Sequence, residues 1–279
     1  MSSGICYSAP MPDVFRDQIF AGKAAFFTGG TSGIGLRIAE RFAEQGARVA
    51  LFGRNQEKLD AAVRSIQTIG AASMAFAGDV RHYGVLEEAL RKTHEAWGWI
   101  DILVCAAAGN FPAPVTGMSA NGFKAVVDID LMGTFNACRA AHEHLRKPGA
   151  SIIAISANHA HQPYAFQAHV CAAKAGVDLL TRTIALEWGA DGIRANCITP
   201  GPIDDTEGMR RLAPSEESRR QVIRHVPLGR MGSKDDIANL AVFLSSDAAS
   251  YITGGVYICD GGQSLVGRGP SPTAGPRAD

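Results

Sequence analysis

The sequence lacks the features typical of metal-binding, disulfide-rich, membrane-spanning and nucleic-acid-binding chains. Its six cysteines are scattered, with no C-x-x-C pair and no histidine at metal-ligand spacing, so we expect reduced thiols and no metal site. No stretch approaches the roughly 20 apolar residues that span a bilayer. Lysine plus arginine and aspartate plus glutamate number 27 each, which argues against nucleic acid or an anionic membrane as the main partner. These absences favour a small-molecule enzyme.

We expect neither end of the sequence to act as a targeting signal. The N-terminal segment MSSGICYSAPMPDVF has neither the basic nor the apolar region of a secretory signal, and the C-terminal PRAD is not a peroxisomal signal. Together with the cysteine pattern, this predicts a cytoplasmic chain.

Short apolar segments alternate with longer amphipathic ones along the 279 residues. The short segments are rich in β-branched or small residues, and the long ones repeat apolar residues at i, i+3, i+4 and i+7. Near-continuous apolar strands alternating with helices predict a single α/β domain, a doubly wound, Rossmann-like parallel sheet with helices on both faces. The predicted strands are residues 24–29, 47–53, 73–79, 100–107, 151–157, 193–200 and 256–262.

We expect this domain to span residues 21–263, after an N-terminal arm at 1–20 and before a flexible tail at 264–279. Residues 202–232 interrupt the alternation with polar, arginine-rich sequence. We interpret this segment as a mobile lid over a substrate site.

A glycine-rich turn, TGGTSGIG, ends the first predicted strand and leads into a helix. Glycines let the backbone approach a pyrophosphate closely, and a helix N-terminus offers free N–H groups and a positive dipole end. A tight turn without a ligand is the alternative, but the position after the first strand favours a dinucleotide site. The expected cofactor contacts in this turn are Gly29, Gly30, Thr31, Ser32, Gly33, Ile34 and Gly35.

The second predicted strand ends with Gly53 and Arg54, where a carboxylate would bind the adenosine ribose of NAD. A guanidinium binds a 2′-phosphate in a fork, whereas an acid repels it, so Arg54 favours NADP(H). The alternative is a solvated arginine at the start of a helix. Asp79, after the third predicted strand, either accepts a hydrogen bond from the adenine amine or caps the next helix.

Several motifs resemble the short-chain dehydrogenase/reductase family: TGGTSGIG, GDV at 78–80, AAG at 107–109, Lys174 at the start of a long helix, and TPGPI at 199–203. The resemblance covers residues 20–262. Within the family, the chain is most similar to 2,4-dienoyl-CoA reductases of the peroxisomal type, through AAGNF at 107–111, DIDLMGTFN at 128–136, HVCAAKAGVD at 169–178 and GPIDDTEGMRRL at 201–212. This implies NADPH-dependent reduction of 2,4-dienoyl-CoA to 3-enoyl-CoA in unsaturated fatty acid β-oxidation, by a homotetramer.

Val170 replaces the tyrosine that most of the family carries four residues before its lysine, and Ala157 replaces the usual serine. That tyrosine shares a helix face with the lysine, whose ammonium favours the phenolate and lets the tyrosine protonate an alkoxide. Tyr164 lies ten residues before Lys174, so it cannot be the same-face partner on a regular helix. We therefore predict a reaction that does not protonate an oxygen.

Reduction of a conjugated dienoyl thioester requires stabilisation of the thioester oxyanion and an acid that protonates carbon, which can be an oriented water. The resemblance assigns this work to Asp130, at the position of the family's asparagine, and to Lys174, which also holds the nicotinamide ribose. Taken alone, Asp130 is better explained as a solvated helix acid, and only one of Asp128 and Asp130 can face a site. His159 either donates a hydrogen bond to the thioester oxygen or is structural.

The resemblance implies the remaining contacts. With the cofactor they are Val80, Gly109, Pro200, Gly201 and Ile203, and with acyl-CoA they are Arg81, Phe111, Ser119, Asn121 and Arg211. Four further arginines of the predicted lid either attract coenzyme A phosphates or form a solvated helix face; they are Arg210, Arg219, Arg220 and Arg224.

Two other functions fit the sequence. One is an NADP-dependent reductase of another activated alkene or of a carbonyl. The other is a non-catalytic NADP-binding sensor that lost its chemistry with the tyrosine. The presence of Lys174 and Asp130 argues against a sensor, because a sensor needs neither an acid nor a proton route.

Overall fold

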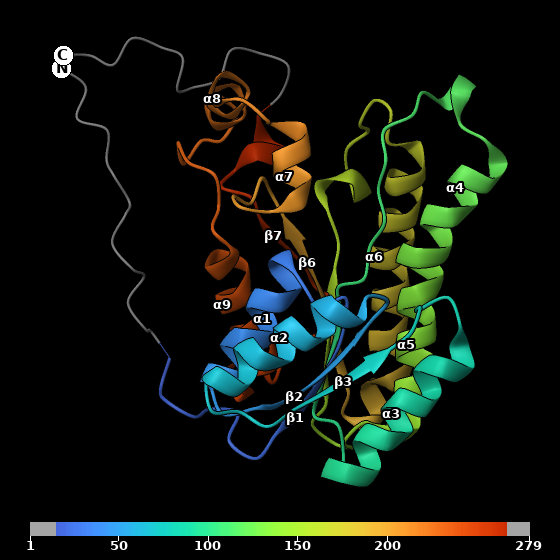
Figure 1. The fold of residues 1–279 in the computed structure, drawn as a ribbon, viewed down its shortest axis with the longest axis vertical. Helices are drawn as coiled ribbons and strands as arrows, with labels where there is room; N and C mark the ends of the chain where they lie inside the picture. The colour runs from blue at the N-terminus through green and yellow to red at the C-terminus, as the bar shows by residue number, and fades with distance from the viewer. Residues whose placement is uncertain (1–14, 267–279) are drawn as a thin grey trace.

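The computed structural model describes residues 15–266 (Figure 1). Residues 1–14 of the predicted arm, residues 267–279 of the predicted tail, and Cys6 lie outside the described part. Inside it, Phe20 is fully buried, with its ring centroid 4.9 Å from that of Phe42. At the other end, the Ser264 N–H donates to the Asp260 carboxylate at 2.7 Å.

Seven parallel strands form one sheet in the order β3-β2-β1-β4-β5-β6-β7. The predicted α/β fold with a Rossmann-like parallel sheet is therefore confirmed, and every predicted strand is present, trimmed at one or both ends. The strands are β1 (Ala24–Thr28), β2 (Arg48–Gly53), β3 (Ser73–Ala77), β4 (Ile102–Cys105), β5 (Ser151–Ile155), β6 (Arg194–Pro200) and β7 (Val256–Cys259).

Helices cover both faces of the sheet, because successive strand residues point to opposite sides. Phe26 and Phe27 of β1 are both fully buried, but in different apolar clusters. The Phe27 side is covered by α1 (Gly33–Glu44), α2 (Gln56–Thr68) and α9 (Lys234–Ser245). The Phe26 side is covered by α3 (Tyr83–Trp97), α5 (Gly133–Ala141) and α6 (Ala168–Trp188), with α4 (Ala120–Val127) beside α6. Between residues 15 and 266, no helix is long and apolar enough to cross a membrane.

The predicted lid contains two short helices, α7 (Glu207–Leu212) and α8 (Glu216–Arg224). They stand above the β6–β7 side of the sheet (Figure 1). Met209, Ala213 and Met231 form a small buried cluster inside this segment. The segment thus has its own apolar core, separate from the two that flank the sheet.

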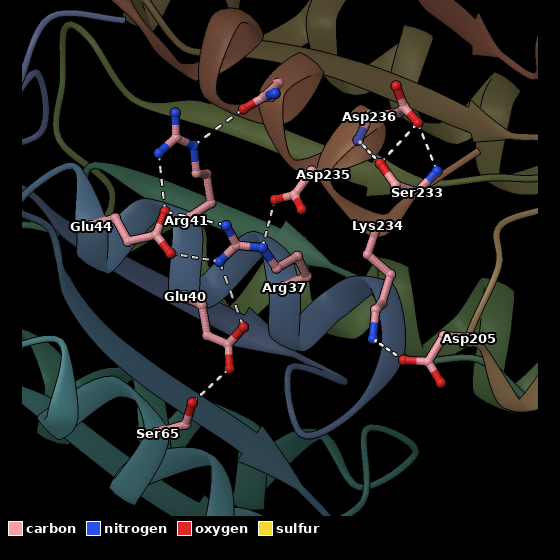
Figure 2. A network of polar contacts seen from close by, with 11 residues as sticks. Arg37, Glu40, Arg41, Glu44, Ser65, Asp205, Ser233, Lys234, Asp235 and Asp236 are labelled. Atoms are coloured by element: carbon pink, nitrogen blue, oxygen red, sulfur yellow. Dashed lines mark hydrogen bonds and ion pairs between the residues drawn. The ribbon is translucent and has the colours of Figure 1, made fainter. Parts of the chain in front are cut away.

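A polar network joins α1 to α9 (Figure 2). Arg37 donates to Asp235 at 2.6 Å and to Glu44 at 2.7 Å, and Arg41 donates to Glu44 at 3.0 Å. Burial alone would raise the pKa of Glu44, but hydrogen bonds from the two arginines outweigh it and hold that pKa below its usual value. The network fixes α1, whose N-terminus follows the glycine-rich turn, to the helix that follows the lid segment.

Candidate active site

A cavity of about 890 Å³ opens at the carboxyl ends of the strands. The strand order reverses between β1 and β4, and ligands of doubly wound sheets bind in the crevice at such a point. The cavity is lined by the glycine-rich turn, by residues after β2 to β6, by Lys174 of α6 and by the lid segment.

The glycine-rich turn allows backbone groups to approach more closely than any side chain permits. A Cβ on Gly29, whose φ is +75°, would lie 2.4 Å from the Ala107 nitrogen, and one on Gly35 would lie 2.5 Å from the Gly29 oxygen. Ser32 is the N-cap of α1, yet its side chain makes no capping hydrogen bond. The turn therefore presents uncapped helix N–H groups beside the cavity, which is the arrangement that binds a pyrophosphate.

Two cations lie at the cavity end next to β2. Arg54 directly follows the strand, and Lys58 lies in the first turn of α2, which Asn55 caps by accepting from the Lys58 N–H at 2.8 Å. Within residues 15–266, neither side chain forms an ion pair. Lys58 is not among the residues predicted from the sequence. The signal for it is its four-residue spacing from Arg54, across a predicted helix start.

Asp79 lines the cavity but is already bound by Arg81. It accepts hydrogen bonds from the Arg81 backbone nitrogen at 3.0 Å and from the guanidinium at 3.0 and 2.6 Å. These bonds hold the pKa of Asp79 at about 2. Arg81 itself does not line the cavity. Asp79 and Arg81, both predicted as ligand contacts, bind each other in this structure.

Asp130 lies in a wide helical turn, Asp128–Met132, between α4 and α5. Its side chain points inward and is 1 % exposed, and Oδ1 accepts from the Gly109 N–H at 2.7 Å. Asp128 instead forms an ion pair with Lys124 on the surface. π-type turns frequently occur at functional sites, since the extra residue redirects side chains.

Lys174 lies in the second turn of α6 and meets Asp130 beneath the cavity. Its Nζ donates to the Ile155 carbonyl at 2.9 Å and lies 3.2 Å from Asp130 Oδ2. Despite that distance, Oδ2 is buried and has no aligned hydrogen bond. A buried acceptor without a hydrogen bond marks a place for a water or a ligand donor.

Neither the position of the family's tyrosine nor that of its serine carries a hydroxyl in this chain. Val170 is buried, and Ala157 lines the cavity beside Ser156, whose buried hydroxyl has no hydrogen-bond partner among residues 15–266. Tyr164 does line the cavity, but from the loop before α6, stacked on His159 with ring centroids 4.1 Å apart. A phenol is therefore present at a position unlike that of the helix-borne tyrosine.

His159 presents a neutral imidazole to the cavity. Burial, and then the positive charge of Lys174, lower the pKa of His159 to about 4. Burial also raises the pKa of Tyr164, so the stacked pair is uncharged at neutral pH. Both rings are able to donate a hydrogen bond without changing the charge of the site.

None of the five residues predicted to contact acyl-CoA lines the cavity. Arg211 is paired with Glu207 on the exposed face of α7, and the Ser119 hydroxyl caps α4 by accepting from the Gly122 N–H at 3.0 Å. The rings of Phe111 and His169 form a T-shaped contact at a centroid distance of 4.5 Å, and Asn121 is exposed on α4.

Among the predicted cofactor contacts, Lys174 and most of the others line the cavity. The exceptions are Gly30, Gly33, Gly109 and Ile203. The lid segment contributes Thr206, Glu207, Gly208, Met209, Leu212 and Val222 to the lining.

Comparisons with known proteins agree with this geometry. The family model described as Enoyl-(Acyl carrier protein) reductase matches residues 29–264. The chain is 43% identical to the Arabidopsis thaliana protein named peroxisomal 2,4-dienoyl-CoA reductase, (3E)-enoyl-CoA-producing, over 90% of this chain and 88% of that protein. It is also 43% identical to a Bacillus subtilis protein named probable 2,4-dienoyl-CoA reductase, (2E)-enoyl-CoA-producing, over 87% of this chain and 97% of that protein.

Solved structures share the fold. A short-chain type dehydrogenase/reductase from Mycobacterium ulcerans superposes with a TM-score of 0.84 at 32% identity, covering 90% of this chain and 92% of that one. The glycine-rich turn, the sheet order and the position of Lys174 are thus accompanied by similarity over nearly the whole chain. This chain belongs to the short-chain dehydrogenase/reductase family.

Proposed function

We propose that this protein is an NADPH-dependent 2,4-dienoyl-CoA reductase, an oxidoreductase that acts on CH–CH bonds and forms 3-enoyl-CoA in unsaturated fatty acid β-oxidation. The proposal rests on the buried pair of Asp130 and Lys174, 3.2 Å apart, in a site where Val170 replaces the helix-borne tyrosine. The names of the relatives from Arabidopsis thaliana and Bacillus subtilis support this substrate class.

The residues present fit a nicotinamide dinucleotide. Backbone atoms occupy the space that a Cβ would need at Gly29 and Gly35, so only glycine fits at these positions. The tight turn that they allow is the one that binds a pyrophosphate. Arg54 and Lys58, both without an ion pair in residues 15–266, suit a 2′-phosphate and favour NADP(H). When bound, NADPH supplies the hydride that is added to the δ-carbon of the substrate.

Asp130 and Lys174 hold the water that protonates the substrate at its α-carbon. The Gly109 N–H fixes one carboxylate oxygen and the Ile155 carbonyl fixes the ammonium, so both groups keep their orientation. Asp130 Oδ2, which lacks an aligned hydrogen bond, accepts one from this water. The ammonium stabilises the hydroxide left after proton transfer, as general acid catalysis requires.

Neutral donors and an apolar wall complete the substrate site. His159 and Tyr164 line the cavity and are able to donate to the thioester oxygen without a net charge. Met209, Leu212 and Val222 of the lid segment supply apolar surface for the acyl chain.

Carbonyl reduction is the second candidate, because Tyr164 brings a phenol into the cavity. Burial raises the pKa of this phenol, which opposes the phenolate that a helix-borne tyrosine and lysine would share. Reduction of another activated alkene needs the same groups as the dienoyl reaction. A cofactor-binding sensor would need neither the buried acid nor a proton route.

We also propose a homotetramer in the cytoplasm. Exposed apolar side chains on α5 and α6, among them Phe135, Leu179 and Leu186, offer surface for a second copy. The cysteines within the described residues are free thiols, in keeping with a reducing compartment.

The proposed activity is tested by NADPH oxidation with three substrates: a 2,4-dienoyl-CoA, a 2-enoyl-CoA and a simple ketone. We expect turnover with the dienoyl thioester and at least about 100-fold less with the ketone, because the site has no helix-borne tyrosine to protonate an alkoxide. Turnover of the ketone alone would contradict the proposal, and tight NADPH binding without any turnover would favour a sensor.

Asp130→Asn tests the acid. The amide keeps the size of the side chain and an oxygen for the Gly109 N–H but removes the charge that orients the water. We expect kcat to fall about 100-fold or more, with the NADPH dissociation constant changed less than about twofold. Asp128→Asn, two residues away and paired with Lys124 on the surface, is the matched control and should keep full activity. An Asp130→Asn variant with at least half the normal kcat would exclude the acid role.

Arg54→Ala tests the cofactor preference. Loss of a charge-assisted hydrogen bond to a 2′-phosphate should weaken NADPH binding about tenfold, while NADH binding changes less than about twofold. Fluorescence titration of both cofactors measures this. Arg64→Ala, an exposed change on α2, serves as the control. Equal losses for NADPH and NADH would show that Arg54 does not recognise the 2′-phosphate.

A further inference from the structure

A second buried acid lies one helical turn beyond Lys174, and the reaction described above does not use it. Asp178 of α6 is 5 % exposed, and neither of its carboxylate oxygens has an aligned hydrogen bond within the described residues. Its close polar neighbour is His161, whose Nε2 lies 3.1 Å from Asp178 Oδ2. Burying a carboxylate with so few partners costs stability, so this position invites a functional explanation.

His161 connects this acid to solvent. Its side chain is 39% exposed, while that of Asp178 is 7% exposed, so the pair runs from the surface to the interior. Imidazole is the side chain that most readily gains and loses a proton near neutral pH. An exposed imidazole against a buried carboxylate is therefore suited to carry protons inward.

Asp178 follows Lys174 by four residues on α6, although the two side chains form no ion pair within residues 15–266. A four-residue spacing puts the two side chains on one face of α6, with roughly 5–6 Å between their Cβ atoms. Cys197 of β6 is affected by both: burial raises the pKa of its thiol to about 12, with Asp178 adding to the rise and Lys174 opposing it. The thiol therefore stays protonated. Within residues 15–266, the titratable groups around Asp178 are His161, by direct contact, Cys197, and Lys174, through the helical spacing.

We propose that His161 and Asp178 form a proton route that recharges Lys174 from solvent during turnover. The inference rests on the proposed function, in which Lys174 supports the protonating water. After that water gives its proton to the α-carbon, the hydroxide takes a proton from the Lys174 ammonium. The Asp178 carboxylate accepts a proton from the His161 imidazolium and passes it through a bridging water to the resulting amine, and His161 takes one from solvent. Each group returns to its starting state with one solvent proton consumed.

The route approaches Lys174 from the side away from the cavity. Lys174 lines the cavity with one side and is otherwise enclosed, with a side chain that is 8% exposed. A cofactor and an acyl chain that fill the cavity would cover this exposed side. The path through Asp178 remains open, because it begins at His161 on the surface.

His161→Gln in the full chain tests the route, with His142→Gln as the matched control. His142 is also a surface histidine paired with an aspartate, Asp191, at 3.2 Å, and like His161 it does not line the cavity, but it lies after α5 instead of after β5. The assay measures kcat, KM and NADPH affinity at saturating dienoyl-CoA, with and without added imidazole. Asp178→Asn, which keeps the shape of the side chain, is measured in parallel.

We expect His161→Gln to lower kcat about tenfold, with KM and NADPH affinity unchanged, and added imidazole to restore at least half of the loss. Asp178→Asn should show a similar loss that imidazole does not restore, because its proton acceptor is gone. His142→Gln should match the wild type. A structural role for His161 would change affinities and would not respond to imidazole.

An unchanged kcat in His161→Gln, a loss that imidazole fails to restore, or an equal loss in His142→Gln would overturn the proton route. The proposed function fails separately, when the wild type does not oxidise NADPH with dienoyl-CoA. In that case, the same variants test the route with whichever alkene or ketone the wild type reduces. A wild type that reduces none of them overturns both proposals.

Discussion

The buried contact between Asp130 and Lys174 is the constraint on which the site depends. Removing two charges from water is costly, and their attraction offsets this only when other groups fix their geometry. The Gly109 N–H and the Ile155 carbonyl do so here, at 2.7 and 2.9 Å. Gly109 lies in the loop after β4 and Ile155 is the last residue of β5, so the central sheet orients the acid and the lysine. The wide turn at Asp128–Met132 brings the acid inward.

The cofactor end of the cavity is also supported by the sheet, through helices α1 and α9 on its Phe27 side. The glycine-rich turn connects β1 to α1, and α1 is fixed to α9 by Arg37 and Arg41 (Figure 2). Lys234, at the start of α9, binds Asp205 at 2.7 Å in the lid segment. Helix α1, which follows the glycine-rich turn, and the lid segment are thus both held by α9.

The sequence predicted the fold because parallel strands are apolar on both faces and the glycine-rich turn follows the first of them. It indicated Asp130 only through family resemblance, since regular helical periodicity does not anticipate a π-type turn. It could not show that Arg81 and Arg211 bind the acids Asp79 and Glu207, because such pairing depends on side-chain conformations. Tyr164 in the cavity was likewise unexpected, because a loop rather than the helix face carries it.

The central claim is that a water held by Asp130 and Lys174 protonates the α-carbon of the substrate. It is tested most directly by running the NADPH reaction with a 2,4-dienoyl-CoA in D₂O and locating the deuterium in the product by NMR and mass spectrometry. The account predicts a 3-enoyl-CoA with one solvent deuterium on the α-carbon and none on the δ-carbon. A 2-enoyl-CoA with solvent deuterium on the γ-carbon would contradict it, because the proton would then reach the substrate at a different atom.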